Sequence, residues 1–198
     1  MVITQELIAG VDEAGRGPLA GPVVAAAVIF PPGFDATGID DSKKLTPERR
    51  EELAIRIRAE TIWTIEFSEV EEIDRLNILW ATMAAMSRAL SRLESSPSRA
   101  WIDGNRLPKT MPCPCEAIID GDAIHPVIGA ASILAKTARD AHMRNLALTY
   151  PLYNFEKNFG YPTPDHLAAL KEHGPCPVHR MSFAPCRPVE QPCLDFEL

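Results

Sequence analysis

The amino-acid sequence predicts an α/β fold, in which helices pack against a central sheet. The segment 23–30 is apolar at almost every position, as expected of a strand that is buried on both faces. In the segment 77–93, apolar residues recur instead at helical spacing, which predicts a helix with one face in the core. That stripe consists of Leu79, Met83, Met86, Leu90 and Leu93. Short apolar runs and helical segments also make up most of the remaining chain, so we expect one sheet covered by helices.

Length and composition are consistent with one domain. The chain has 198 residues, of which 46% are hydrophobic, enough for one well-buried core. We expect residues 1–187 to form a single domain and residues 188–198 a C-terminal tail. The sequence has neither an apolar run of membrane-spanning length nor a basic N-terminal region followed by a long apolar segment, so cytoplasmic placement is expected. The five cysteines are odd in number and lack C-x-x-C spacing, which predicts reduced thiols.

The most distinctive stretch lies near the N-terminus. An apolar strand at 8–11 ends on two adjacent carboxylates, Asp12 and Glu13, and a glycine-rich turn at 15–18 follows. Successive side chains of a strand point to opposite faces. These two acids can therefore share a ligand only if the backbone twists out of strand geometry near residues 14–15, a twist that glycine permits.

The other elements are predicted from caps and periodicity. Thr46 followed by Pro47 marks the start of one helix, and Asn77 caps another. The segment 61–67 alternates apolar and polar residues, which predicts a strand with one solvated face. After the strand at 23–30, the expected elements are a helix at 47–60, the strand at 61–67, a helix from 77 to 93, strands at 99–103 and 116–119, a helix at 128–148, and a short helix at 165–173 within a proline-rich C-terminal part.

Three of the expected strands end in acid. Asp12 and Glu13 follow the first strand, Asp103 ends another, and Asp120 and Asp122 follow a third. Ligands gather at strand ends in open α/β sheets, so these carboxylates can converge on one site. Carboxylate pairs suit hard divalent cations, and a glycine-rich turn with one arginine suits a phosphate. Metal and phosphate side by side indicate phosphodiester chemistry. The residues alone do not choose between Asp120 and Asp122.

The charge distribution is compatible with a polyanionic substrate. The whole chain carries a formal charge of −7, but the segment 123–187 contains seven Lys or Arg against four acids, and all five histidines. A positive region beside an acidic centre can bind a nucleic acid. On the helix at 128–148, Ser132, Lys136 and either Arg139 or Asp140 share one polar face.

The sequence resembles the type 2 ribonucleases H, and in particular the bacterial ribonuclease HII family. The resemblance covers most of the chain, and the motifs occur in the family's order. They are DEAGRGPLAGPVV at 12–24, DSKKL at 41–45, IDG at 102–104, GD at 121–122, ASILAK and TARD at 131–140, GYPT with His166 at 160–166, and HRMSF at 179–183. The resemblance implies a ribonuclease H-like fold, with a central five-stranded mixed sheet flanked by helices and a helical, proline-rich C-terminal part.

The resemblance also implies the activity and its catalytic residues. An endonuclease of this family hydrolyses the RNA strand of RNA–DNA hybrids and cuts 5′ of single ribonucleotides in duplex DNA, leaving a 3′-hydroxyl and a 5′-phosphate, as in ribonucleotide excision repair. Two Mg²⁺ or Mn²⁺ ions would carry the reaction. By the family's motifs, the catalytic and metal-binding residues are Asp12, Glu13, Asp103 and Asp122.

Substrate contacts are likewise implied by the resemblance. Gly15, Arg16 and Gly17 would sense the 2′-hydroxyl through close backbone approach, and Tyr161 would stack on the sugar of the following deoxynucleotide. Ser42, Lys43 and Lys136 are candidates for phosphate contacts. His166, His179 and Arg180 match family positions without a firm role; a structural hydrogen bond and a substrate contact are both open for them.

Two other interpretations compete with this function. A different ribonuclease H-like nuclease, such as a resolvase or a proofreading exonuclease, is disfavoured by the glycine-arginine-glycine turn and the GYPT segment. A binding module without activity is disfavoured because every family acid is present. Ribonuclease HIII is disfavoured because no room for its extra N-terminal domain precedes Asp12.

The tail offers a further contact. Gln191, Leu194 and Phe196 resemble the Q-x-x-L-x-F type of peptide that binds the sliding clamp; the alternative is a disordered or self-packed terminus. We expect a monomer.

Overall fold

The computed structural model describes residues 6–187, and its centre is a five-stranded mixed sheet with the strand order β3-β2-β1-β4-β5. Strand β1 pairs antiparallel with β2 and parallel with β4, while β2–β3 is antiparallel and β4–β5 parallel. The predicted fold class is therefore confirmed. The strands are β1 (Ile8–Ala14), β2 (Val23–Ile29), β3 (Ile62–Ser68), β4 (Arg99–Asp103) and β5 (Cys115–Ile118).

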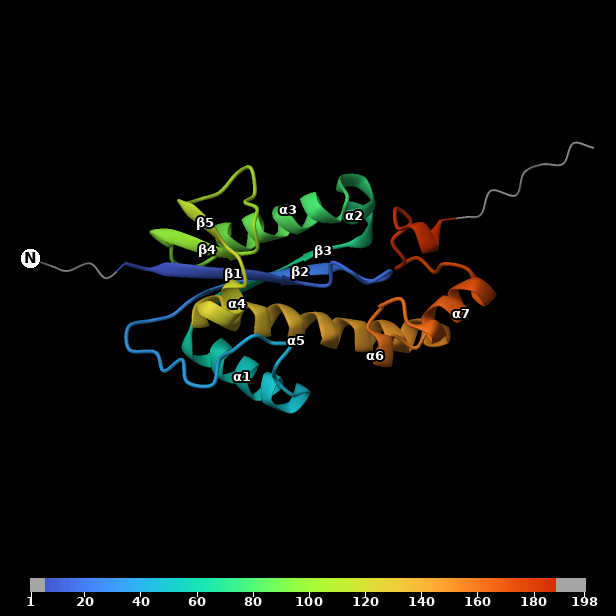
Figure 1. The fold of residues 1–198 in the computed structure, drawn as a ribbon, viewed down its shortest axis with the longest axis horizontal. Helices are drawn as coiled ribbons and strands as arrows, with labels where there is room; N and C mark the ends of the chain where they lie inside the picture. The colour runs from blue at the N-terminus through green and yellow to red at the C-terminus, as the bar shows by residue number, and fades with distance from the viewer. Residues whose placement is uncertain (1–5, 188–198) are drawn as a thin grey trace, which may run out of the picture.

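Helices cover both faces of the sheet (Figure 1). Helices α2 and α3 lie on one face, and α5, with α1 packed against it, lies on the other. The C-terminal helices α6 and α7 gather at the end of the sheet where β1 leads into the glycine-rich turn. The helices are α1 (Pro47–Glu60), α2 (Val70–Leu76), α3 (Ile78–Ser91), α4 (Gly121–Ile124), α5 (Pro126–Thr149), α6 (Phe155–Asn158) and α7 (Pro164–His173).

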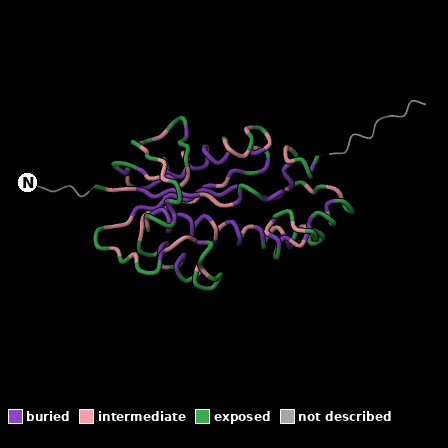
Figure 2. Tube along the Cα trace, viewed as in Figure 1, coloured by how far each residue is buried: buried purple, intermediate pink, exposed green. Residues whose placement is uncertain are grey.

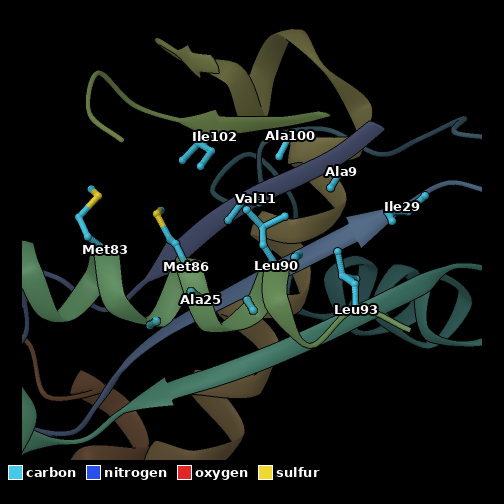
Figure 3. Packing of buried hydrophobic residues seen from close by; sticks show 13 residues of the cluster. Ala9, Val11, Ala25, Ile29, Met83, Met86, Leu90, Leu93, Ala100 and Ile102 are labelled. Carbon is cyan, nitrogen blue, oxygen red and sulfur yellow. The ribbon is translucent and has the colours of Figure 1, made fainter. Parts of the chain in front are cut away.

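The core lies on both sides of β1 and β2, and the buried parts of the chain follow these strands (Figure 2). On the α3 side, Met86 and Leu90 pack over Val11 and Ala25, as the helical stripe predicts (Figure 3). Burying each such large apolar side chain stabilises the folded state by about 1.5–3 kcal/mol. Strand β2 is fully buried along its whole length, which confirms the predicted central strand.

A glycine sets the close approach between β1 and α5. A Cβ atom at Gly10 would lie 2.3 Å from the carbonyl carbon of Val127, in the first turn of α5. No side chain fits in that space, so glycine is required for the helix start to lie directly on the strand. This contact holds the first turn of α5, and α4 just before it, against the first half of β1.

Several boundaries and environments differ from the sequence predictions. Strand β1 continues through Asp12 and Glu13 to Ala14, and α2, α4 and α6 were not predicted. The solvated face predicted for β3 was wrong, because no residue of β3 is exposed. Thr64 donates a hydrogen bond to the carbonyl of Ala89 in α3, and Glu66 forms ion pairs with arginines of the same segment. These polar residues of β3 therefore face a helix and not water.

Candidate active site

The ends of β1 and β4 bring three acids together. Parallel pairing aligns Val11 with Ile102, so Asp103, the last residue of β4, lies beside the Asp12–Glu13 step of β1. The chain leaves strand geometry at Gly15, where φ is 97°, as predicted, but Asp12 and Glu13 before it remain paired with β2. Asp12 and Glu13 lie on opposite faces of β1. They nevertheless share a neighbour, Asp103, because β4 ends beside them.

The two acids of β1 have different surroundings. Asp12 is buried, and its carboxylate interacts with the hydroxyl of Ser132 from α5 and with the backbone N–H of Glu13. Glu13 faces the α3 side, where its Oε1 lies 3.2 Å from the guanidinium of Arg16. The pair therefore reaches both sides of the sheet at one point.

Asp122 joins the same group through the strand end of β5. The carboxylate of Asp103 accepts hydrogen bonds from the backbone N–H groups of Gly121 at 2.8 Å and Asp122 at 3.3 Å, which fixes the start of α4. The side chain of Asp122 is buried beside Asp103, whereas Asp120 is exposed and left-handed, with φ 55°. The structure therefore places Asp122, and not Asp120, next to the other acids.

Crowding and burial disfavour the ionised forms of these acids. Burial, followed by the charges of Glu13 and Asp103, raises the pKa of Asp12 well above its usual value. Burial also raises the pKa of Glu13, against the lowering effect of Arg16. For Asp122, burial and the charges of Asp103 and Asp41 raise the pKa. A cation bound among these groups would relieve this repulsion.

Lys43 is the nearest cationic side chain to Asp122. Its Nζ atom lies 3.6 Å from Asp122 Oδ2, while most of the side chain is exposed. Partial burial lowers the pKa of Lys43, but the charges of Asp122, Asp41, Asp12 and Asp103 outweigh this effect and raise it. Lys43 therefore faces the acids from the solvent side. Asp41, on the same loop, was not singled out from the sequence as a member of this group.

The donor set fits a hard divalent cation. Within residues 6–187, no group of three or more Asp, Glu, His or Cys side chains already forms a cage around an ion position. Mg²⁺ does not need such a cage, because it usually keeps several waters and uses only one or two carboxylates together with substrate phosphates. The buried carboxylates of this site are not fully neutralised by nearby cationic side chains, which is consistent with this mode of binding.

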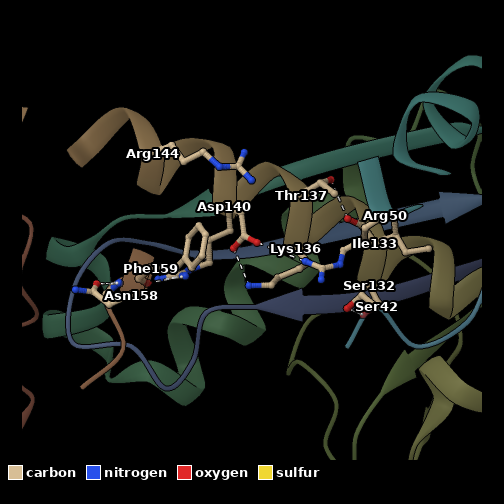
Figure 4. A network of polar contacts seen from close by, with 12 residues as sticks. Ser42, Arg50, Ser132, Ile133, Lys136, Thr137, Asp140, Arg144, Asn158 and Phe159 are labelled. Atoms are coloured by element: carbon tan, nitrogen blue, oxygen red, sulfur yellow. Dashed lines mark hydrogen bonds and ion pairs between the residues drawn. The ribbon is translucent and has the colours of Figure 1, made fainter. Parts of the chain in front are cut away.

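The other two predicted phosphate contacts, Ser42 and Lys136, interact with neighbouring side chains (Figure 4). Ser42 is buried, and its hydroxyl lies 2.9 Å from that of Ser132, which in turn contacts Asp12. Ser42 therefore supports the acid cluster from behind instead of facing solvent. Lys136 is held by Asp140 at 2.7 Å and lies over the ring of Phe159.

The glycine-rich turn and Tyr161 are neighbours. A Cβ atom at Gly17 would lie 3.6 Å from Cε1 of Tyr161, and both residues are exposed. Arg16, between the two turn glycines, is also exposed and contacts Glu13. Gly15 is buried, with φ 97°, a conformation that favours glycine. The predicted 2′-hydroxyl sensor and the predicted stacking residue thus share one surface beside the acids.

A cleft of about 250 Å³ opens on the α3 side of the acids. Glu13, Arg16 and Asp103 line it together with Asn105 and Arg106, which follow β4. The sequence analysis did not single out Asn105 or Arg106; their position directly after Asp103 and Gly104 was the available signal. Ser132 was noticed only as part of a polar helix face, because its contact with Asp12 depends on tertiary packing.

A mixed five-stranded sheet with carboxylates gathered at adjoining strand ends defines a ribonuclease H-like nuclease. The family model for ribonuclease HII matches residues 9–186. A ribonuclease HII of Bordetella pertussis is 54% identical over 94% of this chain and 92% of its own length. The chain belongs to the ribonuclease HII family. It is accordingly a ribonuclease H, with endonuclease activity on RNA–DNA hybrids, from a family that uses divalent metal ions.

Solved structures show the same fold. The ribonuclease H2 of Pyrococcus horikoshii aligns with a TM-score of 0.78 and 28% identity, covering 91% of this chain and 95% of that one. A ribonuclease HII of Archaeoglobus fulgidus, solved in a complex with PCNA, aligns with a TM-score of 0.64 and 29% identity over 83% of this chain and 85% of that one.

Three other predictions concern the rest of the chain. The cysteines at 113, 115, 176 and 186 are free thiols, as predicted for them. None of the helices in the described part of the chain has the length and apolar character needed to cross a membrane. The clamp-binding residues predicted in the tail, Gln191, Leu194 and Phe196, lie outside the described residues.

Proposed function

We propose that the protein cuts the RNA strand of hybrids and also cuts 5′ of single ribonucleotides embedded in duplex DNA, using two divalent ions at Asp12, Glu13, Asp103 and Asp122. The observation that supports this most is the convergence of these four carboxylates from β1, β4 and the start of α4, with Asp12 and Asp122 buried and their pKa values raised. Residues 1–187 would act as the catalytic domain.

In this proposal the acids hold and orient the ions. Divalent ions supply a Lewis acid that activates the attacking water and stabilises the leaving oxygen. Asp103 also accepts hydrogen bonds from the backbone N–H groups of Gly121 and Asp122. It would therefore bind an ion with its own carboxylate and also position Asp122, a second ligand. Lys43, exposed and close to Asp122, would contact a phosphate of the cut strand, and Lys136 a more distant one. The products would carry a 3′-hydroxyl and a 5′-phosphate.

Recognition of the ribonucleotide would come from the turn of Gly15, Arg16 and Gly17, in which Arg16 and Gly17 are exposed and Gly15 is buried, and from the exposed Tyr161. A backbone without side chains at Gly17 lets a sugar approach closely, and the amide N–H groups of the turn can bond the 2′-hydroxyl. The exposed ring of Tyr161, next to Gly17, is in position to stack on the following sugar.

The direct test uses labelled DNA duplexes with Mg²⁺ or Mn²⁺. One duplex carries a single ribonucleotide, a matched duplex carries none, and a third contains a continuous RNA strand. We expect a single cut 5′ of the embedded ribonucleotide, cleavage of the RNA strand, and no cleavage of the all-DNA duplex. Cleavage of the continuous strand without any cut at the single ribonucleotide would restrict the activity to long hybrids.

Replacing Tyr161 with alanine should change specificity more than catalysis. Without the ring, the enzyme loses stacking at the RNA–DNA junction, so we expect about tenfold lower kcat/KM on a single embedded ribonucleotide and a smaller loss on continuous RNA. Tyr161→Phe keeps the ring and should keep the preference. Equal losses on both substrates would assign Tyr161 to packing or to general binding.

We further propose that the tail binds the sliding clamp through Gln191, Leu194 and Phe196. The support is the motif in the sequence and the complex with PCNA of the Archaeoglobus relative. Tethering would raise the enzyme's local concentration on DNA without changing catalysis. Truncation after Arg187 should leave cleavage by the isolated enzyme unchanged and abolish clamp binding in calorimetry. A triple alanine variant of the three residues should match the truncation. Failure of the intact protein to bind its own organism's clamp would refute the proposal.

A further inference from the structure

The glycine-rich turn is held between two segments from the C-terminal part of the chain. Residues 178–180 lie along residues 19–21, with hydrogen bonds from Gly21 N–H to the carbonyl of Val178 and from Arg180 N–H to the carbonyl of Leu19. On the other side, Leu19 N–H donates to the carbonyl of Gly160 at 2.7 Å. Two segments far apart in sequence therefore hold residues 19–21, which directly follow the turn.

Arg180 holds the inner side of this turn. Its fully buried guanidinium donates to the carbonyl oxygens of Gly15 at 2.6 Å, Arg16 at 3.0 Å, Gly21 at 2.9 Å and Pro22 at 3.1 Å. In a trans peptide the N–H group points opposite to the carbonyl oxygen. Because the carbonyls of Gly15 and Arg16 point inward to Arg180, the N–H groups of Arg16 and Gly17 point away from it, toward the outer surface.

The residue before Arg180 is part of a second hydrogen-bonded chain. His166 Nδ1 lies 2.8 Å from the carbonyl oxygen of Tyr161, which can only accept, so Nδ1 carries the proton. Its Nε2 is then an acceptor for Nε2–H of His179 at 3.0 Å, and Nδ1 of His179 accepts from the backbone N–H of Cys176 at 2.9 Å. This assignment leaves both rings neutral and satisfies all four ring nitrogens.

Burying the side chains of His166, His179 and Arg180 costs free energy, which indicates a role beyond stabilising the fold. Burial lowers the pKa of His166, and burial with the neighbouring His166 lowers that of His179 to about 4. Burial, followed by the charge of Arg139, lowers the pKa of Arg180 to about 9. Apolar side chains of similar size often stabilise a fold as well as buried polar groups do or better. What the polar groups add is a defined orientation of the turn and of Tyr161.

We propose that Arg180, His179 and His166 form one positioning unit that keeps the N–H groups of the glycine-rich turn and the ring of Tyr161 in fixed relative positions. The unit acts through residues 15–17 and Tyr161 and does not touch the substrate. Its effect on specificity rests on the recognition surface proposed above, whereas its effect on the free protein does not. It gives a function to three residues that the sequence left without one.

Two measurements test the unit on the intact protein. In the free enzyme, His166→Leu and Arg180→Lys should increase amide hydrogen exchange in both segments 15–22 and 160–163. In cleavage, His166→Leu should lower the preference for a single embedded ribonucleotide over continuous RNA by no more than Tyr161→Ala does, because it acts through the ring of Tyr161. His166→Asn can still donate to the Tyr161 carbonyl from the position of Nδ1 and should recover most of this loss.

A double variant separates positioning from general stability. His166→Leu combined with Tyr161→Ala should show no further loss of preference beyond Tyr161→Ala alone, because both act on the same ring. His173→Leu, the same change at an exposed histidine of the same helix, should alter neither exchange nor preference. If His166→Leu does not fold, His166→Asn and Arg180→Lys carry the exchange measurement.

Each outcome bears on a different claim. Unchanged exchange in both segments, or independent losses in the double variant, would overturn the positioning unit. Increased exchange together with an unchanged preference in Tyr161→Ala would support the positioning unit and refute the proposed role of Tyr161.

Discussion

Asp12→Asn is expected to abolish cleavage, by at least about 10³-fold, while leaving the fold intact and the metal-free protein more stable. The loss follows from removing a charge that the proposed ions need, which is equivalent to several kcal/mol of transition-state stabilisation. The gain in stability follows from the site itself, where the Asp12 carboxylate is buried beside Glu13 and Asp103. Cleavage assays, thermal melts and Mn²⁺ titration by calorimetry measure the three effects.

The stability gain should depend on pH. Burial and neighbouring acids raise the pKa of Asp12 in the folded protein, so the folded state is penalised as pH rises above the unfolded value of about 3.9 toward the raised pKa. The difference in Tm between Asp12→Asn and the unchanged protein should therefore be small near pH 4 and reach its maximum above the raised pKa. Each kcal/mol relieved is worth about 2–4 °C.

Asp120→Asn is the matched control for this prediction. Asp120 lies two residues from Asp122 but is exposed, and asparagine tolerates its left-handed backbone. It should change neither cleavage nor metal binding. Substantial metal-dependent activity in Asp12→Asn, or a large loss in Asp120→Asn, would contradict the assignment of the acids.

The sequence predicts best the elements whose pattern reflects a single environment. Strand β2 is buried on both faces and α3 has one apolar stripe, so composition and periodicity were sufficient. Strand β3 looked half-solvated because its polar residues alternate, but Glu66 faces Arg88 and Arg92 across a tertiary contact. A local pattern cannot distinguish water from a charged partner on another element.

The same limit applies to the site. The four acids could be named from strand ends and family motifs, but the residues alone left Asp120 and Asp122 equivalent. The structure separates them through the hydrogen bonds of Asp103 to the backbone of residues 121–122. Ser132 contacts Asp12 from α5, about 120 residues further along the chain, so no spacing rule could reveal it.

Gly15→Ala is expected to destabilise the protein by about 3 kcal/mol, or about 6–12 °C in Tm. An added Cβ would lie 2.0 Å from Nε of Arg139 and 2.9 Å from the carbonyl oxygen of Pro22, at a φ of 97°. Arg139 cannot move away without breaking its own hydrogen bonds, because its guanidinium donates to the carbonyls of Pro22, Ala20 and Phe159. Both the backbone conformation and the packing therefore oppose the substitution.

Gly17→Ala provides the opposite result at the other glycine of the turn. Its added Cβ would meet only the ring of Tyr161, at an ordinary contact distance of 3.6 Å, so the Tm should stay within about 2 °C of the unchanged protein. Cleavage of a single embedded ribonucleotide should nevertheless fall at least about tenfold, because the methyl group would occupy the space through which, in the proposed function, the sugar approaches the backbone. Thermal melts and cleavage rates for the two variants, measured side by side, distinguish the glycine required for folding from the glycine required for recognition. A large Tm loss in Gly17→Ala, or full activity in that variant, would show that the exposed side of the turn is not the surface that reads the ribonucleotide.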